Sequence, residues 1–191
     1  MSGSGNIWAI DAQHTSVGFS VRFLEISNVK GGFSTVGGSL EYDSREPLKF
    51  KLDAFVGADS ISTHNEMRDR HLKEEAMFFD VEKFRLVEFR SSSAEAAGVG
   101  KLKVTGDLTL HGVTREAVFD VEGPTQEVAD PLTGKIKMAA FARARINRND
   151  FGMTMPLLME AGTYLIGDEV DISIDAVFER ENRRAMRIRP E

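Results

Sequence analysis

The chain has 191 residues, a formal net charge of −6 and no cysteine. An acidic chain lacks the basic face that non-specific nucleic-acid binding needs, and without cysteine there is no disulfide or thiol chemistry. No apolar run reaches the roughly 18 residues of a transmembrane helix, so stable membrane insertion is not expected. We predict a disordered N-terminus at residues 1–6, one domain at residues 7–180 and a charged C-terminal tail at residues 181–191.

The N-terminal sequence also bears on location. Residues 1–6 contain neither the basic region nor the apolar run of a signal peptide. The sequence therefore predicts a cytoplasmic protein. A periplasmic or secreted location stays open if the N-terminus has been trimmed.

Apolar and polar residues alternate with period two in the first third of the chain, which is typical of half-buried strands. Strands are expected within residues 7–23, at residues 33–42 and at residues 48–56, with a turn at residues 28–32. Gly37-Gly38 lies inside the second strand and predicts a bulge or a sharp bend.

A short helix is predicted within residues 60–80. Thr63 followed by Glu66 has the spacing of a capping box, which places the helix start at Thr63. The apolar stripe formed by Met67 and Leu72 is too narrow for the core of a helical bundle. We therefore expect the helix to lie over a surface made of strands, with one mouth of a barrel as a candidate position.

The rest of the chain returns to period two, with loops predicted at residues 92–100 and 123–134. Strands are expected from residue 87 and at residues 101–111, 117–121, 136–146 and 170–178. About eight strands with one apolar face close well into a barrel or a sandwich. The fold class is therefore all-β, and the preferred architecture is an antiparallel barrel of about eight strands with a short helix between strands.

The interior of this barrel is the candidate functional region. The chain contains 13 Phe and 8 Met but only 1 Trp and 2 Tyr, a composition that suits either a Phe-rich core or a large apolar interior. An eight-stranded barrel can pack solid or hold one apolar ligand. The methionine-rich loop at residues 153–159 is interpreted as a rim for ligand entry, or alternatively as a plug at one barrel end.

Several motifs resemble those of the YceI-like family. They are Asp11–Phe19, Gly31–Phe33, Asn65–Leu72, Phe78–Asp80, Thr105–Arg115, Asn147–Gly152 and Gly167–Val170. The resemblance extends in order over residues 7–180. It implies an extended, lipocalin-like antiparallel barrel. It also implies binding of a long amphiphilic lipid in the interior, typically a polyisoprenoid such as an isoprenoid quinone or a prenyl diphosphate.

The predicted site combines inward apolar positions with polar residues at a mouth. The expected ligand-binding residues are Val17, Phe19, Val21, Phe33, Phe50, Leu52, Met67, Leu108, Phe119, Val121, Ala140, Ala142, Ala144, Met153, Met155 and Leu158. The expected head-group residues are Arg68, Asn147 and Arg148. For each apolar residue taken alone, ordinary core packing is the alternative.

Catalysis and metal binding are not predicted. The four histidines lack the spacing of converging metal ligands, and no nucleophile–base arrangement or phosphate-binding loop is present. The expected partner is a long-chain lipid, with no cofactor and with a homodimer left open. The expected function is non-catalytic lipid binding, transport or storage. The alternatives are a stress-related interaction protein with a filled core and an enzyme acting on a lipid in the same cavity.

Overall fold

A computed structural model describes residues 7–154 and 165–180, and the segments predicted to be disordered or tail-like at 1–6 and 181–191 lie outside it. Most of the described chain is strand. The helices are α1 (Glu66–Glu74) and the 3-10 helices η1 (Ala58–Ser60) and η2 (Arg148–Phe151). The strands are β1 (Ile7–Ile10), β2 (Ser16–Phe23), β3 (Ser27–Phe33), β4 (Val36–Glu41), β5 (Lys51–Gly57), β6 (Ile61–Ser62), β7 (Leu86–Gly98), β8 (Lys101–Leu110), β9 (Val113–Glu122), β10 (Val128–Ala129), β11 (Ile136–Asn147) and β12 (Ile166–Arg180).

Eight antiparallel strands close into a barrel, as predicted. The ring runs β11-β9-β8-β7-β5-β4-β1-β12, and pairing of β12 with β11 closes it. The β11–β12 ladder is continuous from Ile136 opposite Arg180 to Asn147 opposite Glu169. Closure leaves no edge between these two strands, so the apolar inner faces of the ring are enclosed together.

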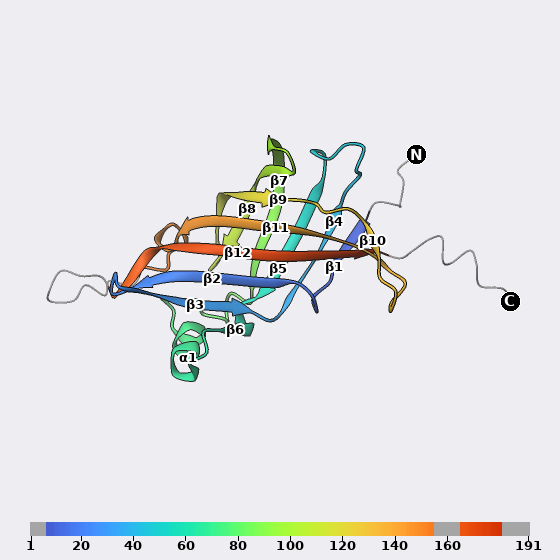
Figure 1. The fold of residues 1–191 in the computed structure, drawn as a ribbon. Coiled ribbons are helices and arrows are strands. Elements are labelled where there is room, and N and C mark those ends of the chain that lie inside the picture. The colour runs from blue at the N-terminus through green and yellow to red at the C-terminus, as the bar shows by residue number, and fades with distance from the viewer. Residues whose placement is uncertain (1–6, 155–164, 181–191) are drawn as a thin grey trace.

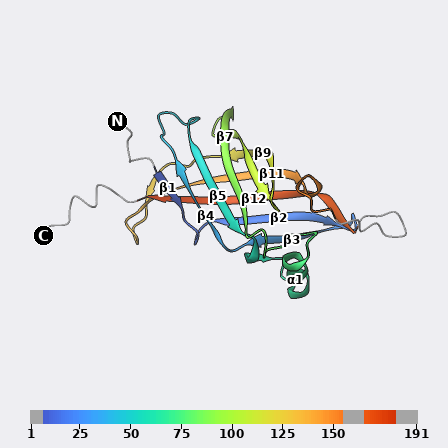
Figure 2. The same ribbon diagram turned by 180° about the vertical axis from the view of Figure 1, so that it is seen from behind.

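The barrel is extended because β12 is long enough to pair with two strands along one edge. Near its end it pairs with β1, where Phe178 lies opposite Ile10, and before that it pairs with β2, where Ile172 lies opposite Phe19. β3 and β6 continue the sheet beyond β2. Figures 1 and 2 show β2 and β3 running beside β12, with α1 on the outside next to β3 and β6. The helix therefore covers this extension.

Two predicted irregular segments are strands. Residues 28–32 belong to β3, where Gly31 pairs with Phe19 and Gly32 pairs with Gly18. Residues 92–98 continue β7 through register shifts to Gly98, opposite β8. Small residues favour loops in both segments, but pairing with a neighbouring strand overrides this weak local preference. The predicted strand at 33–42 is divided, since β3 ends at Phe33 and β4 begins at Val36.

The predicted start of the helix is wrong by two residues. Asn65 is the N-cap, and its side-chain oxygen accepts a hydrogen bond from the backbone N–H of Arg68 at 2.9 Å. His64 has a left-handed backbone with φ +61°, which turns the chain after Thr63. The hydroxyl of Thr63 instead donates to Asp69 and accepts from Nε of Arg68. Thr63 thus contacts side chains of the first turn but does not cap the backbone of the helix.

The barrel interior contains two separate buried clusters. The first, here called the plug cluster, comprises Leu108, Leu110, Ala117, Phe119, Phe151 and Met153. The second, here called the Trp8 cluster, comprises Trp8, Leu40, Met138 and Phe178. The guanidinium of Arg180 lies over the Trp8 ring at 4.6 Å, where the cation interacts favourably with the π face. Within the described residues, no helix is long and apolar enough to cross a membrane.

Candidate functional site

A cavity of about 210 Å³ lies inside the barrel, bordered by residues of both buried clusters. Its walls come from strands of the ring and from the extension formed by β2 and β3. A cavity of this size with apolar walls offers water few hydrogen-bond partners, so an apolar guest is favoured over water inside it.

The structure brings many of the predicted ligand-binding residues together around this cavity. Those that border it are Val17, Phe19, Phe33, Phe50, Leu52, Leu108, Phe119, Val121, Ala140 and Ala142. They come from six strands and one loop that are distant in sequence. Alternation along each strand therefore identified the face that points inward.

Other predicted residues do not border the cavity. Val21 and Ala144 follow the last residue of their inward rows that borders the cavity. Met153 is buried in the plug cluster, which supports the plug interpretation for this residue. Met67 is 67 % exposed on α1, because the helix lies outside the barrel. Met155 and Leu158 lie outside the described residues.

The residues predicted to bind a head group make other contacts. Arg68 donates to the hydroxyl and the carbonyl oxygen of Thr63, both at 2.7 Å. The Asn147 amide oxygen caps η2 by accepting from the N–H of Asn149, and its nitrogen donates to Glu169. Neither side chain is among the residues that border the cavity, so a head-group role for them stays a prediction.

Arg148, the third predicted head-group residue, is a buried structural cation. Its Nε donates to the carbonyl oxygen of Gly167 at 3.1 Å, and its Nη2 lies 2.6 Å from Oδ1 of Asp168. Its Nη1 donates to the carbonyl oxygen of Met153. A buried guanidinium needs several acceptors to offset its desolvation, and these three contacts supply them. Arg148 therefore fixes the segment that carries the plug cluster.

One end of the cavity was missed by the sequence reasoning. Tyr42, Pro47 and Pro124 border the cavity there, and they lie in the connections after β4 and after β9. Burial raises the pKa of the Tyr42 phenol, and the nearby charges of Glu127 and Asp43 raise it further. We call this loop-lined end the mouth. Pro47 and Pro124 lie outside the predicted strands and carry no period-two signal, so alternation could not assign them to the cavity. Tyr42 ends the predicted strand at residues 33–42 but is not among the predicted site residues.

Further wall residues lie on strand faces that are predicted to point inward, but they are not among the predicted site residues. They include Leu102, Val104, Val87, Phe89, Ile172, Ile174, Ala176 and Phe178. The same alternation would have found them. Among the described lining residues, the ionisable side chains are Tyr42 and Glu88, and Glu88 is exposed on β7.

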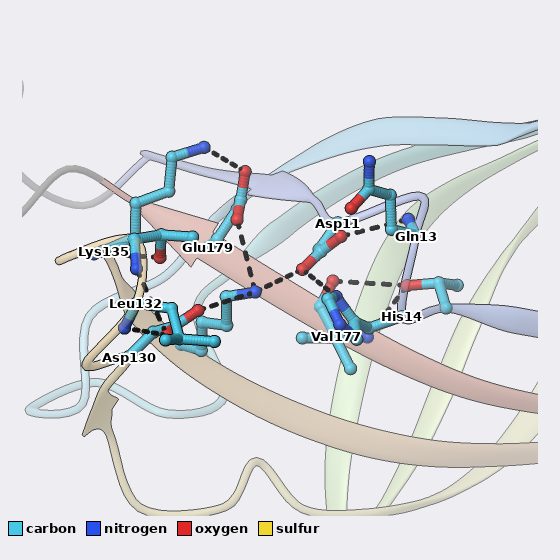
Figure 3. A network of polar contacts seen from close by, with 11 residues as sticks. Asp11, Gln13, His14, Asp130, Leu132, Lys135, Val177 and Glu179 are labelled. Carbon is cyan, nitrogen blue, oxygen red and sulfur yellow. Dashed lines mark hydrogen bonds and ion pairs between the residues drawn. The ribbon is translucent and has the colours of Figure 1, made fainter.

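A polar network fixes the barrel on its outer side, near the Trp8 cluster. Nζ of Lys137 lies 2.7 Å from Oδ2 of Asp11, 3.3 Å from Oδ2 of Asp130 and 3.7 Å from Oε2 of Glu179. Figure 3 shows the three carboxylates pointing toward one another from different segments. His14 bonds the same Asp11 oxygen at 2.7 Å. The network thereby ties the turn after β1, the loop before β11, and β12 to one lysine.

Two carboxylates in this network have strongly lowered pKa values. Burial by itself would raise the pKa of Asp11, but hydrogen bonds from Lys137, His14 and the N–H of Gln13 outweigh it and lower the pKa to about 2. The N–H of Leu132, the Thr133 hydroxyl and Lys137 lower the pKa of Asp130 to about 2. Both groups are therefore anions at neutral pH.

The histidines do not converge in the described structure. His14 contacts Asp11, and Nδ1 of His111 lies 3.3 Å from the carbonyl oxygen of Phe151. In residues 7–154 and 165–180 no three His, Asp or Glu side chains are grouped so that they could hold a metal ion.

Comparison with known proteins identifies the family. A family model described as the YceI-like domain matches residues 8–178. The chain belongs to the YceI-like family. A UPF0312 protein of Staphylococcus aureus is 32 % identical over 173 residues, covering 90 % of this chain and 96 % of the relative.

Solved structures with the YceI-like barrel share the fold at lower identity. Burkholderia cenocepacia BcnA superposes with a TM-score of 0.76 at 19 % identity, covering 88 % of this chain and 98 % of BcnA. A polyisoprenoid binding domain from Saccharophagus degradans superposes with a TM-score of 0.64 at 14 % identity, covering 90 % of this chain and 97 % of that domain. These likenesses establish the extended barrel.

Proposed function

We propose that this YceI-like protein binds the apolar tail of a long amphiphilic lipid, such as a polyisoprenoid, in its barrel, and that it carries or stores the lipid without converting it. The observation that supports this most is the cavity of about 210 Å³ between the two buried clusters. The name of the Saccharophagus degradans domain is consistent with the proposal.

Desolvation of the tail drives binding in this proposal. Each buried methylene gains about 0.8 kcal/mol gross. Ordering of a flexible chain and loss of its free motion oppose that gain. By scaling from a cavity of about 150 Å³ that takes benzene, 210 Å³ accommodates roughly eight carbon atoms. The rest of a longer tail, and its head group, would extend through the mouth.

The cavity also bears on the alternatives. A filled-core interaction protein would have its inward side chains in contact throughout, whereas these walls border open space. An enzyme would need an acid or base in the cavity, and the described ionisable wall residues are Tyr42 and the exposed Glu88. Simple binding needs only the apolar walls.

The test is native mass spectrometry of gently purified protein, followed by organic extraction. We expect an adduct that dissociates into a long-chain species. After delipidation, a prenyl alcohol added back should restore the adduct. Protein that is empty when purified and that takes up neither prenyl nor acyl chains would refute the proposal.

A further inference from the structure

We infer that four phenylalanine rings form a fixed floor in the cavity and determine how much of an apolar chain it encloses. The rings belong to Phe19, Phe33, Phe89 and Phe119, and all four border the cavity. The inference rests on the proposed function, because it assigns the end of the tail to this floor. It adds a specificity determinant that the sequence pattern does not distinguish from ordinary core.

The cavity ends part-way along the inward rows of the barrel. On five strands the last inward residue that borders it is followed by an inward residue that does not. The bordering residues are Phe19, Leu108, Phe119, Ala142 and Ile172, and their successors are Val21, Leu110, Ala117, Ala144 and Val170. The boundary is staggered between strands, since Ile172 borders the cavity and its partner Ala144 does not. The cavity nevertheless does not reach Leu110, Phe151 or Met153.

Contacts between rings hold the four rings in two pairs. Phe89 and Phe119 pack edge to face with centroids 4.9 Å apart, and Phe19 and Phe33 lie 5.9 Å apart. Phe33 also packs edge to face on Phe79 at 5.8 Å. Ring pairs in these geometries attract one another beyond simple burial, so they hold their positions.

Two of the rings occupy space that only glycine leaves free. A Cβ on Gly31 would lie 2.5 Å from Cζ of Phe19, and a Cβ on Gly106 would lie 2.5 Å from Cζ of Phe89. Each ring therefore lies against the neighbouring strand, close to its backbone. Any other residue in place of either glycine would push the ring or the strand away. The glycines thus define where the floor rings lie.

The space behind the floor is filled. Leu110, Phe151 and Met153 are buried there in the plug cluster. Arg148 holds this segment through the carbonyl oxygens of Met153 and Gly167 and through Asp168. An apolar chain that enters at the mouth therefore stops at the rings.

A fixed floor predicts how affinity depends on chain length. For straight-chain primary alcohols, affinity should rise about fourfold for each added methylene while that methylene is buried. It should stop rising at roughly eight carbons, when the cavity of 210 Å³ is full. Additional carbons lie outside the mouth and add little.

The experiment measures the affinity of delipidated protein for alcohols of about four to about fourteen carbons, by displacement of an environment-sensitive apolar dye. Phe89→Ala should move the plateau to chains longer by about three carbons, because the ring volume becomes available. Phe89→Leu should give a smaller shift in the same direction. It is the test variant if Phe89→Ala fails to fold. Phe151→Leu is the matched control behind the floor and should leave the plateau unchanged.

The inferred floor would be contradicted if the plateau stayed in place in both Phe89 variants, or if it moved equally in Phe151→Leu. Neither outcome would contradict lipid binding itself. Affinity that keeps rising to the longest alcohols in the unaltered protein would also overturn it. Absence of any alcohol binding by the unaltered protein would refute the proposed function, and the floor with it.

Discussion

Nζ of Lys137 on β11 lies 2.7 Å from Oδ2 of Asp11 in the turn after β1, and the two side chains are 18 % and 7 % exposed. The pair joins segments that are 126 positions apart in the chain. Since the same lysine also faces Asp130 and Glu179, it is the cation that three carboxylates share.

Replacing this lysine should be costly. Lys137→Met leaves Asp11 buried with two other acids nearby, and breaking a buried pair from one side costs about 3 kcal/mol of unfolding free energy. Urea denaturation measures the loss. Lys103→Met, which removes an exposed pair with Asp120, is the control and should cost no more than about 0.5 kcal/mol. Equal losses in the two variants would contradict a special role for Lys137.

Asp11 should make stability fall in acid. Its pKa is about 2 in the fold against an ordinary value of 3.8, so its contribution is complete above pH 3.8 and is lost as the pH falls toward 2. The shift corresponds to about 2 kcal/mol. Denaturation at a series of pH values should show this decrease, and Asp11→Asn should reduce it. An unchanged acid dependence in Asp11→Asn would assign the decrease to other carboxylates.

The cap of α1 should depend on Asn65. Asn65→Ala removes the bond to the N–H of Arg68 and should destabilise the helix by about 1 kcal/mol. Hydrogen exchange of residues 66–74 should accelerate. Glu66→Ala is the control, since Asn65 and not Thr63 caps the helix, and it should have little effect on exchange. Faster exchange in Glu66→Ala alone would indicate that Thr63 and Glu66 cap the helix instead.

Filling the cavity should abolish uptake of lipid without unfolding the barrel. Ala142 borders the cavity on β11, and Ala142→Trp places an indole in the space of the tail. Native mass spectra should lose the adduct while circular dichroism keeps the strand signal. Phe141→Trp, on the exposed neighbouring position, should retain the adduct. Retention of the adduct in Ala142→Trp would place the tail elsewhere.

The alternation of residues predicted the barrel and most of its inner face. It did not predict which inward residues border the cavity. Val17 and Val21 have the same pattern, yet only Val17 borders the cavity. Depth depends on which loops fill each end, and the burial of Met153 and Arg148 arises from contacts with distant segments. The helix start was misjudged because Asn65 and Thr63 are both good caps, and the left-handed backbone of His64 selects between them.

The position of β12 in the chain has a consequence for biosynthesis. This strand follows every other described strand in sequence, yet it pairs with β1 and β2, which come first. During translation, hairpins such as β2–β3 and β8–β9 can form as they emerge. The ring can close only after residues 166–180 have left the ribosome. Until then, the apolar faces of β1 and β2 lack pairing with β12 on the nascent chain. Long-range pairing of this kind slows folding.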